Sequence, residues 1–125
     1  MPFTYRIEAG GSIAHVTGVG QGDVDSAHST FSELLNDKNI HRPFGLLIDV
    51  RALHNLPNRE ETADIAMFAR VDAEHYTALV VQRGVQFGMA RMIQMLAELQ
   101  GARIKIFTDD LMAQLWLRNQ LNRLQ

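Results

Sequence analysis

Three polar residues near the middle of the chain have side chains that could take part in chemistry. Asp49, Arg51 and His54 stand at and just after the end of a short apolar run. An aspartate near a histidine can act in acid–base catalysis. No nucleophile is evident, however, because the serines lie outside any Gly-x-Ser-x-Gly elbow and the chain has no cysteine. We therefore predict no catalytic residues, and an enzyme built on Asp49 and His54 ranks third among our hypotheses.

The same residues belong to a set that suits anion binding. In open α/β sheets, ligands usually bind beyond the carboxyl ends of the parallel strands. We expect five side chains to gather there, namely Asp49, Arg51, His54, Arg59 and Arg83. The positive end of a helix starting near Arg59 would add to their attraction for a phosphate, a carboxylate or an acidic side chain of a partner. The plainer interpretation, which we favour, pairs Arg51 with Asp49 or Glu61 on a solvated rim.

Neither a metal site nor a phosphate-binding loop is indicated elsewhere. The five histidines fall in separate segments, and no two of them have the spacing of metal ligands on a helix, so we predict no metal and no cofactor. The glycine-rich segment 18–22 lacks the Rossmann and Walker spacings, and Asp23 would repel an anion there. We interpret this segment as a tight structural turn.

The composition is that of an ordinary globular protein. The chain has 125 residues, a net charge of −2 and 46% hydrophobic residues, which predicts a single domain spanning residues 1–125. Its small charge gives no general attraction to nucleic acid or acidic membranes. No apolar run approaches the roughly 18 residues needed to span a bilayer, and no leader segment is recognised. We expect a cytoplasmic protein that neither binds nucleic acid nor inserts into membranes.

The pattern of apolar residues predicts the elements that position these side chains. Strands are expected at about residues 4–9, 13–19, 45–50, 76–81 and 103–108, and helices at about residues 23–36, 58–70, 85–100 and 109–124. The third and fourth strands are continuous apolar runs, typical of strands covered on both faces, whereas the outer strands alternate. These features predict an α/β fold with a five-stranded mixed sheet in chain order, comprising an antiparallel first hairpin, then parallel strand–helix units, and four helices.

The last two predicted helices carry more apolar surface than contact with a sheet requires. In the helix 109–124, one stripe holds Leu111, Met112, Leu115 and Trp116, and roughly the opposite stripe holds Leu117, Leu121 and Leu124. Either the helix bends near Arg118 or the second stripe meets another subunit, and we favour the second explanation. The predicted interface consists of Met67, Met92, Met95, Leu117, Leu121 and Leu124.

Three parts of the chain form one pattern, namely the opening hairpin, Leu47-Ile48-Asp49, and residues 104–109 leading into Leu115-Trp116-Leu117. This pattern resembles the SpoIIAA-like proteins, which are related in fold to STAS (sulfate-transporter and anti-sigma-factor-antagonist) domains. The resemblance covers nearly the whole chain and implies a protein-interaction or regulatory module without chemistry of its own. In the antagonist branch, a phosphorylated serine follows the aspartate matched by Asp49. No serine or threonine follows here before Thr62, so we do not carry the phosphorylation switch over.

Two principal hypotheses for function follow. The first is a non-enzymatic protein-interaction or regulatory module of STAS-like type that self-associates as a homodimer through its last helix. The alternative is a small-molecule binding protein for a lipid or an anionic ligand, with Phe68, Phe87 and methionine-rich surfaces lining an apolar pocket between helices. An internal pocket of several hundred cubic ångströms would favour the alternative, and a filled core with a flat apolar face would favour the first.

Overall fold

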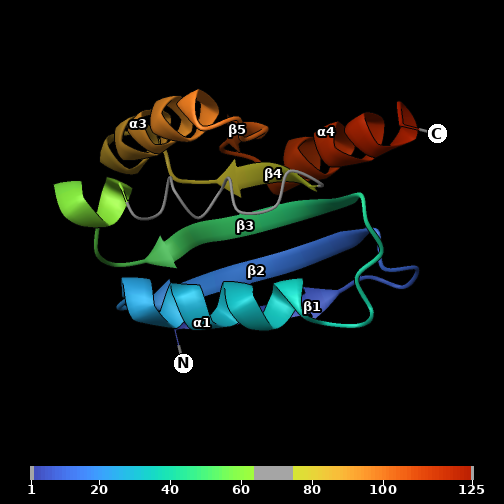
Figure 1. Ribbon diagram of the computed structural model, residues 1–125. Coiled ribbons are helices and arrows are strands. Elements are labelled where there is room, and N and C mark those ends of the chain that lie inside the picture. Colours follow the sequence, from blue (N-terminus) through green and yellow to red (C-terminus); the bar gives the residue numbers. More distant parts are fainter. Residues whose placement is uncertain (1, 64–74, 125) are drawn as a thin grey trace.

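The structure is a computed structural model that describes residues 2–63 and 75–124. Its five strands are β1 (Phe3–Ile7), β2 (Ile13–Gly20), β3 (Phe44–Leu53), β4 (His75–Val80) and β5 (Ile104–Phe107). They form one sheet in the order β1-β2-β3-β4-β5, in which only the β1–β2 pair is antiparallel (Figure 1). The predicted α/β fold with a mixed sheet in chain order is therefore confirmed.

The β1–β2 hairpin turns through two glycines with positive φ, as its sequence indicates. Gly10 and Gly11 have φ values of 94° and 77°, a region that glycine adopts at little cost. A Cβ on Gly11 would collide with the carbonyl oxygen of Asn39. The hairpin therefore also depends on glycine for its close approach to the loop before β3.

The central strand β3 is covered on both faces, as predicted. Leu46 packs in a cluster with Phe3, Val16 and Leu34, whereas the next residue, Leu47, packs on the opposite face. The strand is longer than predicted, because it continues in parallel pairing with β2 as far as Leu53. Asp49 and Arg51 thus lie within the strand and not beyond its end.

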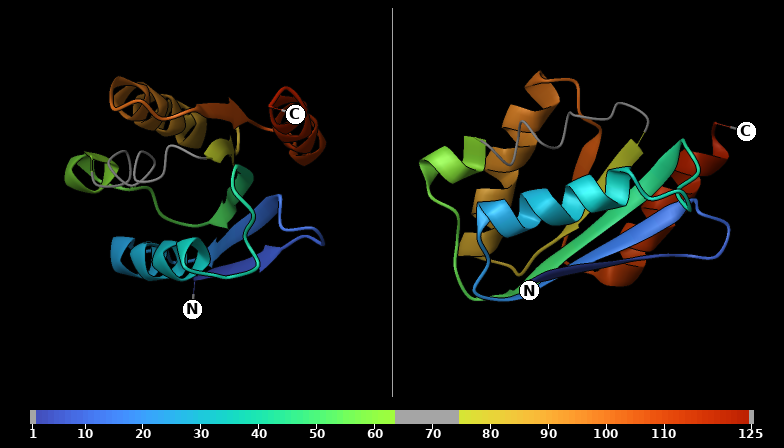
Figure 2. Two further views of the ribbon diagram at one scale, coloured as in Figure 1. Left: turned by 45° about the vertical axis from the view of Figure 1, so that its right-hand side comes forward. Right: turned by 60° about the horizontal axis from the view of Figure 1, so that its bottom comes forward.

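The helices lie in two layers on either side of the sheet. Helix α1 (Val24–Leu35), the helical residues 59–63 and α3 (Val85–Leu99) lie on one side of the sheet, and α4 (Asp110–Asn122) lies on the other (Figure 2). None of the described helices is long and apolar enough to cross a membrane. The predicted continuation of the second helix to residue 70, with Met67 and Phe68, falls outside the described residues.

Capping hydrogen bonds confirm the predicted helix starts at Asp23, Asn58 and Asp109, whereas α3 starts at Gly84 without a side-chain cap. The Asp23 carboxylate accepts a hydrogen bond from the backbone N–H of Ser26, and Asp109 accepts two at the start of α4. Asn58 and Glu61 form a reciprocal capping box, in which each side chain accepts from the other residue's backbone N–H. These contacts satisfy backbone donors that have no partner within the helix.

The predicted orientation of the last helix is wrong. Leu117 and Leu121 are buried, and Leu117 packs with Leu47, Ala78 and Val80 of the sheet. Leu111, Met112 and Leu115, on the other side of the helix, are exposed. The helix approaches β3 at Gly45, where an added Cβ would lie 3.2 Å from Cδ2 of Leu117. This small residue lets the Leu117–Leu121 stripe seat against the sheet, so neither leucine can form the expected interface, whereas Leu124 is exposed.

Candidate functional site: the strand-end rim and an apolar cavity

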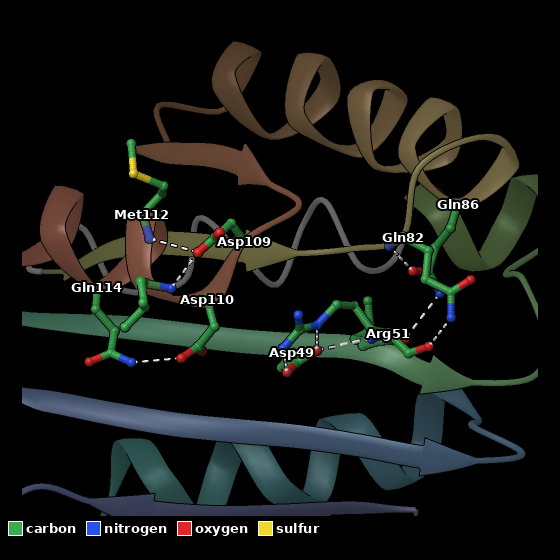
Figure 3. Close-up of polar contacts among 10 residues, drawn as sticks. Asp49, Arg51, Gln82, Gln86, Asp109, Asp110, Met112 and Gln114 are labelled. Atoms are coloured by element: carbon green, nitrogen blue, oxygen red, sulfur yellow. Dashed lines mark hydrogen bonds and ion pairs between the residues drawn. The ribbon is translucent and has the colours of Figure 1, made fainter.

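Asp49 and Arg51 form an ion pair on the face of the sheet that α4 covers. Nη2 and Nε of Arg51 donate to the two carboxylate oxygens of Asp49 at 2.8 and 3.0 Å, and the backbone N–H of Arg51 donates to the same carboxylate at 3.0 Å (Figure 3). Partial burial tends to raise the pKa of Asp49, but these hydrogen bonds outweigh it and hold the pKa below its ordinary value. The charges of Asp49 and Arg51 therefore neutralise each other within the pair.

The backbone around this pair is held by Gln82 of the β4–α3 connection and by Gln86 in the first turn of α3. Nε2 of Gln82 donates to the carbonyl oxygen of Arg51 at 2.5 Å, and Nε2 of Gln86 donates to that of Val50 at 3.0 Å (Figure 3). Hydrogen bonding to Asp49 raises the pKa of Arg51 against the effect of burial, and the nearby carboxylates of Asp110 and Asp109 add to the increase. The negative charge of these carboxylates favours the charged form of Arg51 and repels an incoming anion.

The other three residues of the predicted anion site do not join the pair. His54, Arg59 and Arg83 are exposed, in the loop after β3, at the start of the helical residues 59–63 and in the turn after β4. Within residues 2–63 and 75–124, Asp49 and Arg51 form the one ion pair of this group. The structure thus agrees with the plainer interpretation of Arg51 as the partner of Asp49, and it does not assemble a catalytic pair from Asp49 and His54.

A second charged cluster, which the sequence did not indicate, joins the hairpin to α4. Nε2 of His15 lies 2.6 Å from Oε2 of Glu8, and Nη2 of Arg118 donates to Oε1 of Glu8 at 3.2 Å. Burial tends to raise the pKa of Glu8, but the hydrogen bonds from His15 and Arg118 outweigh it and lower the pKa. In the described part of the chain, no three His, Asp or Glu side chains lie close enough to hold a metal ion.

An apolar cavity of about 160 Å³ lies on the opposite face of the sheet, between α1, α3 and the strands. Its walls include Ala27 and Phe31 of α1, Ile48 of β3, Leu79 of β4 and Ala90 of α3. An apolar cavity of roughly 150 Å³ holds one molecule the size of benzene. We expected a pocket of several hundred cubic ångströms in a small-molecule binding protein and a filled core in an interaction module. The observed cavity lies between these two expectations, since it is smaller than such a pocket but is not filled by the side chains that line it.

Among the described residues, four polar side chains line this cavity, those of Asn55, His75, Thr77 and Gln86, and the two amides bond the protein backbone. The Asn55 amide donates to the carbonyl oxygen of Gly22 and accepts from its backbone N–H, both at 2.8 Å. Gln86 accepts from the backbone N–H of Gln82 while it donates to Val50. A molecule inside the cavity would therefore be held by shape and dispersion contacts more than by hydrogen bonds.

The prediction for the pocket lining holds only in part, because Met89 of the methionine-rich helix α3 lines the cavity whereas Phe87 does not. Phe87 packs in the cluster of Leu79 and Val81 near β5, and Phe68 falls outside the described residues. The one signal that could have located the space is the small size of Ala27 and Ala90 on the inward faces of their helices. The segment 18–22 has the structural role that we expected, since Asn55 binds Gly22 and the backbone N–H of His54 donates to the carbonyl of Gly20.

Apolar side chains are also exposed on the two long C-terminal helices. Met92 and Met95 of the predicted interface are exposed on α3, together with Val85, Leu96 and Leu99. On α4 the exposed fractions of Leu111, Met112 and Leu115 are 69, 56 and 57%. The predicted excess of apolar surface is therefore present on both helices, but on α4 it lies on the other stripe.

Comparison of the chain with protein-family models, with curated proteins and with solved structures gave no match. Inferences about function therefore depend on the geometry of the cavity, the rim and the exposed helix faces.

Proposed function

We propose that this protein is a non-enzymatic binding protein that takes a small apolar molecule into the cavity between α1, α3 and the sheet. The observation that carries the proposal is the cavity itself, about 160 Å³ with almost wholly apolar walls. Closely packed cores leave few voids larger than a water molecule, so a space of this size represents lost contacts that a ligand would restore.

The composition of the walls defines the class of ligand. Ile48 and Leu79 offer only carbon atoms, and the nearby amides of Asn55 and Gln86 are occupied by the backbone. A charged group would lose most of its hydration there, since of the described residues besides the two amides only His75 and Thr77 bring polar side-chain atoms to the walls. We therefore infer an uncharged hydrocarbon group, either a small aromatic or aliphatic molecule or one segment of an acyl chain, and not a whole lipid.

The proposal is tested by titrating the full-length protein with benzene and with hexane while methyl NMR signals are recorded. We expect saturable shifts at the methyl groups of Leu46, Ile48 and Leu79, which line the cavity. Mass spectrometry of an organic extract of protein purified from its native cell would then identify the natural ligand. Absence of saturable shifts with both probes would refute the proposed site.

A matched pair of substitutions on α1 separates binding in the cavity from binding to the surface. Ala27→Leu places three more carbon atoms against the cavity, and we expect it to weaken binding of the probe by about tenfold or more. Ser29→Leu adds a leucine to an exposed position of the same helix and should leave the affinity unchanged. Equal affinity in the wild type and Ala27→Leu would show that the probe binds elsewhere.

The second candidate is a protein-interaction or regulatory module of SpoIIAA-like, STAS-like type. The exposed apolar side chains of α3, including Met92, Met95 and Leu99, support it, as does the resemblance in the order of the elements. Methionine side chains adapt readily to different contact surfaces. We keep this candidate second because Leu117 and Leu121, on which the interaction surface was based, are packed inside the protein.

A further inference from the structure

Strand β4 brings a buried hydroxyl group, that of Thr77, to the wall of the apolar cavity. The residue lines the cavity and is only 3% exposed. Its backbone N–H donates to the carbonyl oxygen of Arg103 at 2.8 Å, but its side-chain hydroxyl makes no hydrogen bond within residues 2–63 and 75–124. Neighbouring atoms do not seal the hydroxyl oxygen, so the cavity is the space that is open to it.

The register of the sheet explains why the Thr77 hydroxyl has no partner in the protein. Thr77 lies between Leu46 of β3 and Ile104 of β5, and both of these apolar residues also line the cavity. Along β4, the adjacent residues on the same face are Leu79 and His75. No hydrogen bond joins Thr77 to His75 in the described part of the chain, so the side chains around Thr77 on this face leave its hydroxyl unbonded.

The packing of the core does not account for a threonine at this position. The large majority of buried polar side-chain atoms in proteins have a hydrogen-bonding partner. A buried hydroxyl without one loses its bonds to water and gains nothing in return. Valine has nearly the same shape and would fill the position without this cost. Polar groups that reduce stability in this way are typical of binding sites, where a ligand supplies the missing partner.

We propose that Thr77 is the polar contact for the ligand of this cavity, and that this ligand is an uncharged molecule about the size of benzene with one hydroxyl group. A threonine hydroxyl donates one hydrogen bond and also accepts, so it can pair with a ligand hydroxyl in either direction. The inference rests on the proposed function, because it narrows the ligand class of the same cavity. The hydrocarbon part of the ligand would lie against Ile48 and Leu79.

The composition of the walls favours this ligand over a water molecule or a more polar ligand. A buried water molecule needs two to four polar partners, and of the described side chains beside Thr77 on its face of the sheet, only His75 is polar. A ligand with several polar groups would leave most of them unbonded, because the amides of Asn55 and Gln86 already bond the backbone. One hydroxyl on a hydrocarbon frame matches one free hydroxyl on the wall.

The proposal is tested by titrating the full-length protein with phenol and with benzene while methyl NMR signals are recorded. Phenol differs from benzene by one hydroxyl group and is uncharged at pH 7. We expect Thr77→Val to weaken the binding of phenol by about tenfold, since the phenol hydroxyl would then be buried without a partner. The affinity for benzene should stay within about twofold of the wild type.

Two further variants provide the controls. Thr77→Ser keeps a hydroxyl at this position and should keep the ratio of the phenol and benzene affinities within about twofold of the wild type. Thr17→Val makes the same change as Thr77→Val at an exposed position of β2 and should leave both affinities unchanged. Circular dichroism should show that all three variants are folded.

Stability of the ligand-free protein gives an independent measurement. Because Thr77→Val removes an unbonded hydroxyl and keeps the shape of the side chain, it should raise the urea concentration at the midpoint of unfolding. A lower midpoint would show that the hydroxyl is bonded in the folded protein, and the proposal would be wrong.

The titrations distinguish failure of this inference from failure of the proposed function. Binding of neither probe would remove the ligand site and this inference with it. Saturable binding of benzene, together with a phenol affinity that Thr77→Val leaves unchanged, would keep the cavity as a ligand site but overturn the role of Thr77. An equal loss of affinity for both probes in Thr77→Val would also overturn that role, because the effect would then come from the shape of the wall.

Discussion

Glu8 joins three parts of the fold through one carboxylate. It follows β1, and it binds His15 on β2 and Arg118 on α4. The side chains of Glu8 and His15 are only 24 and 9% exposed, so the contact is less screened by water than a surface ion pair. Because its partners come from separate elements, this carboxylate helps to fix α4 relative to the hairpin.

The lowered pKa of Glu8 predicts a loss of stability in acid. A carboxylate whose pKa is lower in the folded than in the unfolded state stabilises the fold above the unfolded value, and this contribution is lost as the pH falls through the folded value. We expect Glu8→Gln to lower the free energy of unfolding by about 1–2 kcal/mol at pH 7. The difference from the wild type should shrink below about pH 4, as measured by urea unfolding at several pH values.

The exposed Glu98 on α3 provides the control for this residue. Glu98→Gln should change the free energy of unfolding by less than about 0.5 kcal/mol at every pH. A difference between Glu8→Gln and the wild type that stays constant from pH 7 to pH 3 would contradict the assignment of the effect to the Glu8 carboxylate.

At the scale of elements, α4 has a buried stripe and an exposed stripe that are both rich in leucine. Leu117→Ala should lower the free energy of unfolding by about 2–5 kcal/mol, because it leaves a cavity against Leu47 and Val80. Leu115→Ala, two residues away on the exposed side, should cost less than about 1 kcal/mol in the monomer. The free energies of unfolding of the two variants are compared by thermal or urea unfolding at a protein concentration at which the chain is monomeric. The reverse order of the two effects would restore the orientation that we first predicted.

The contrast between α4 and the strands explains which elements can be predicted from sequence. The apolar run of β3 is continuous and short, and Pro43 precedes it, which together favour a strand covered on both faces. The caps at Asp23 and Asp109 are local contacts that the sequence specifies directly. In α4, apolar residues occupy two stripes, so periodicity alone cannot identify the buried one. The close approach at Gly45 decides it, and that contact joins residues far apart in the chain.

The candidate sites were less predictable than the fold for a related reason. The pairing of Arg51 with Asp49 could be anticipated, because two residues of one strand separated by one position share a face. The cavity depends on how Ala27 of α1 and Ala90 of α3 fit over the same part of the sheet. An unfilled space results from several side chains together and leaves no pattern in any one segment.

At the scale of the whole molecule, the sheet separates the cavity from the exposed side of α4. The cavity lies on the α1–α3 side, and Leu115 lies on α4, on the far side of the sheet. We therefore predict that Leu115→Lys leaves the affinity for the benzene probe within about twofold of the wild type in the same NMR titration. A larger loss of affinity would reveal coupling across the sheet.

Helix α4 follows all five strands in the sequence, and this affects the order in which the protein can fold during synthesis. Of the described helices, only α4 covers Leu47, Ala78 and Val80, and it begins at Asp110. A nascent chain can therefore pair β1 to β4 while the apolar face that α4 later covers is still exposed to water. Until α4 leaves the ribosome, chaperones can bind this apolar face, and nascent chains can aggregate through it.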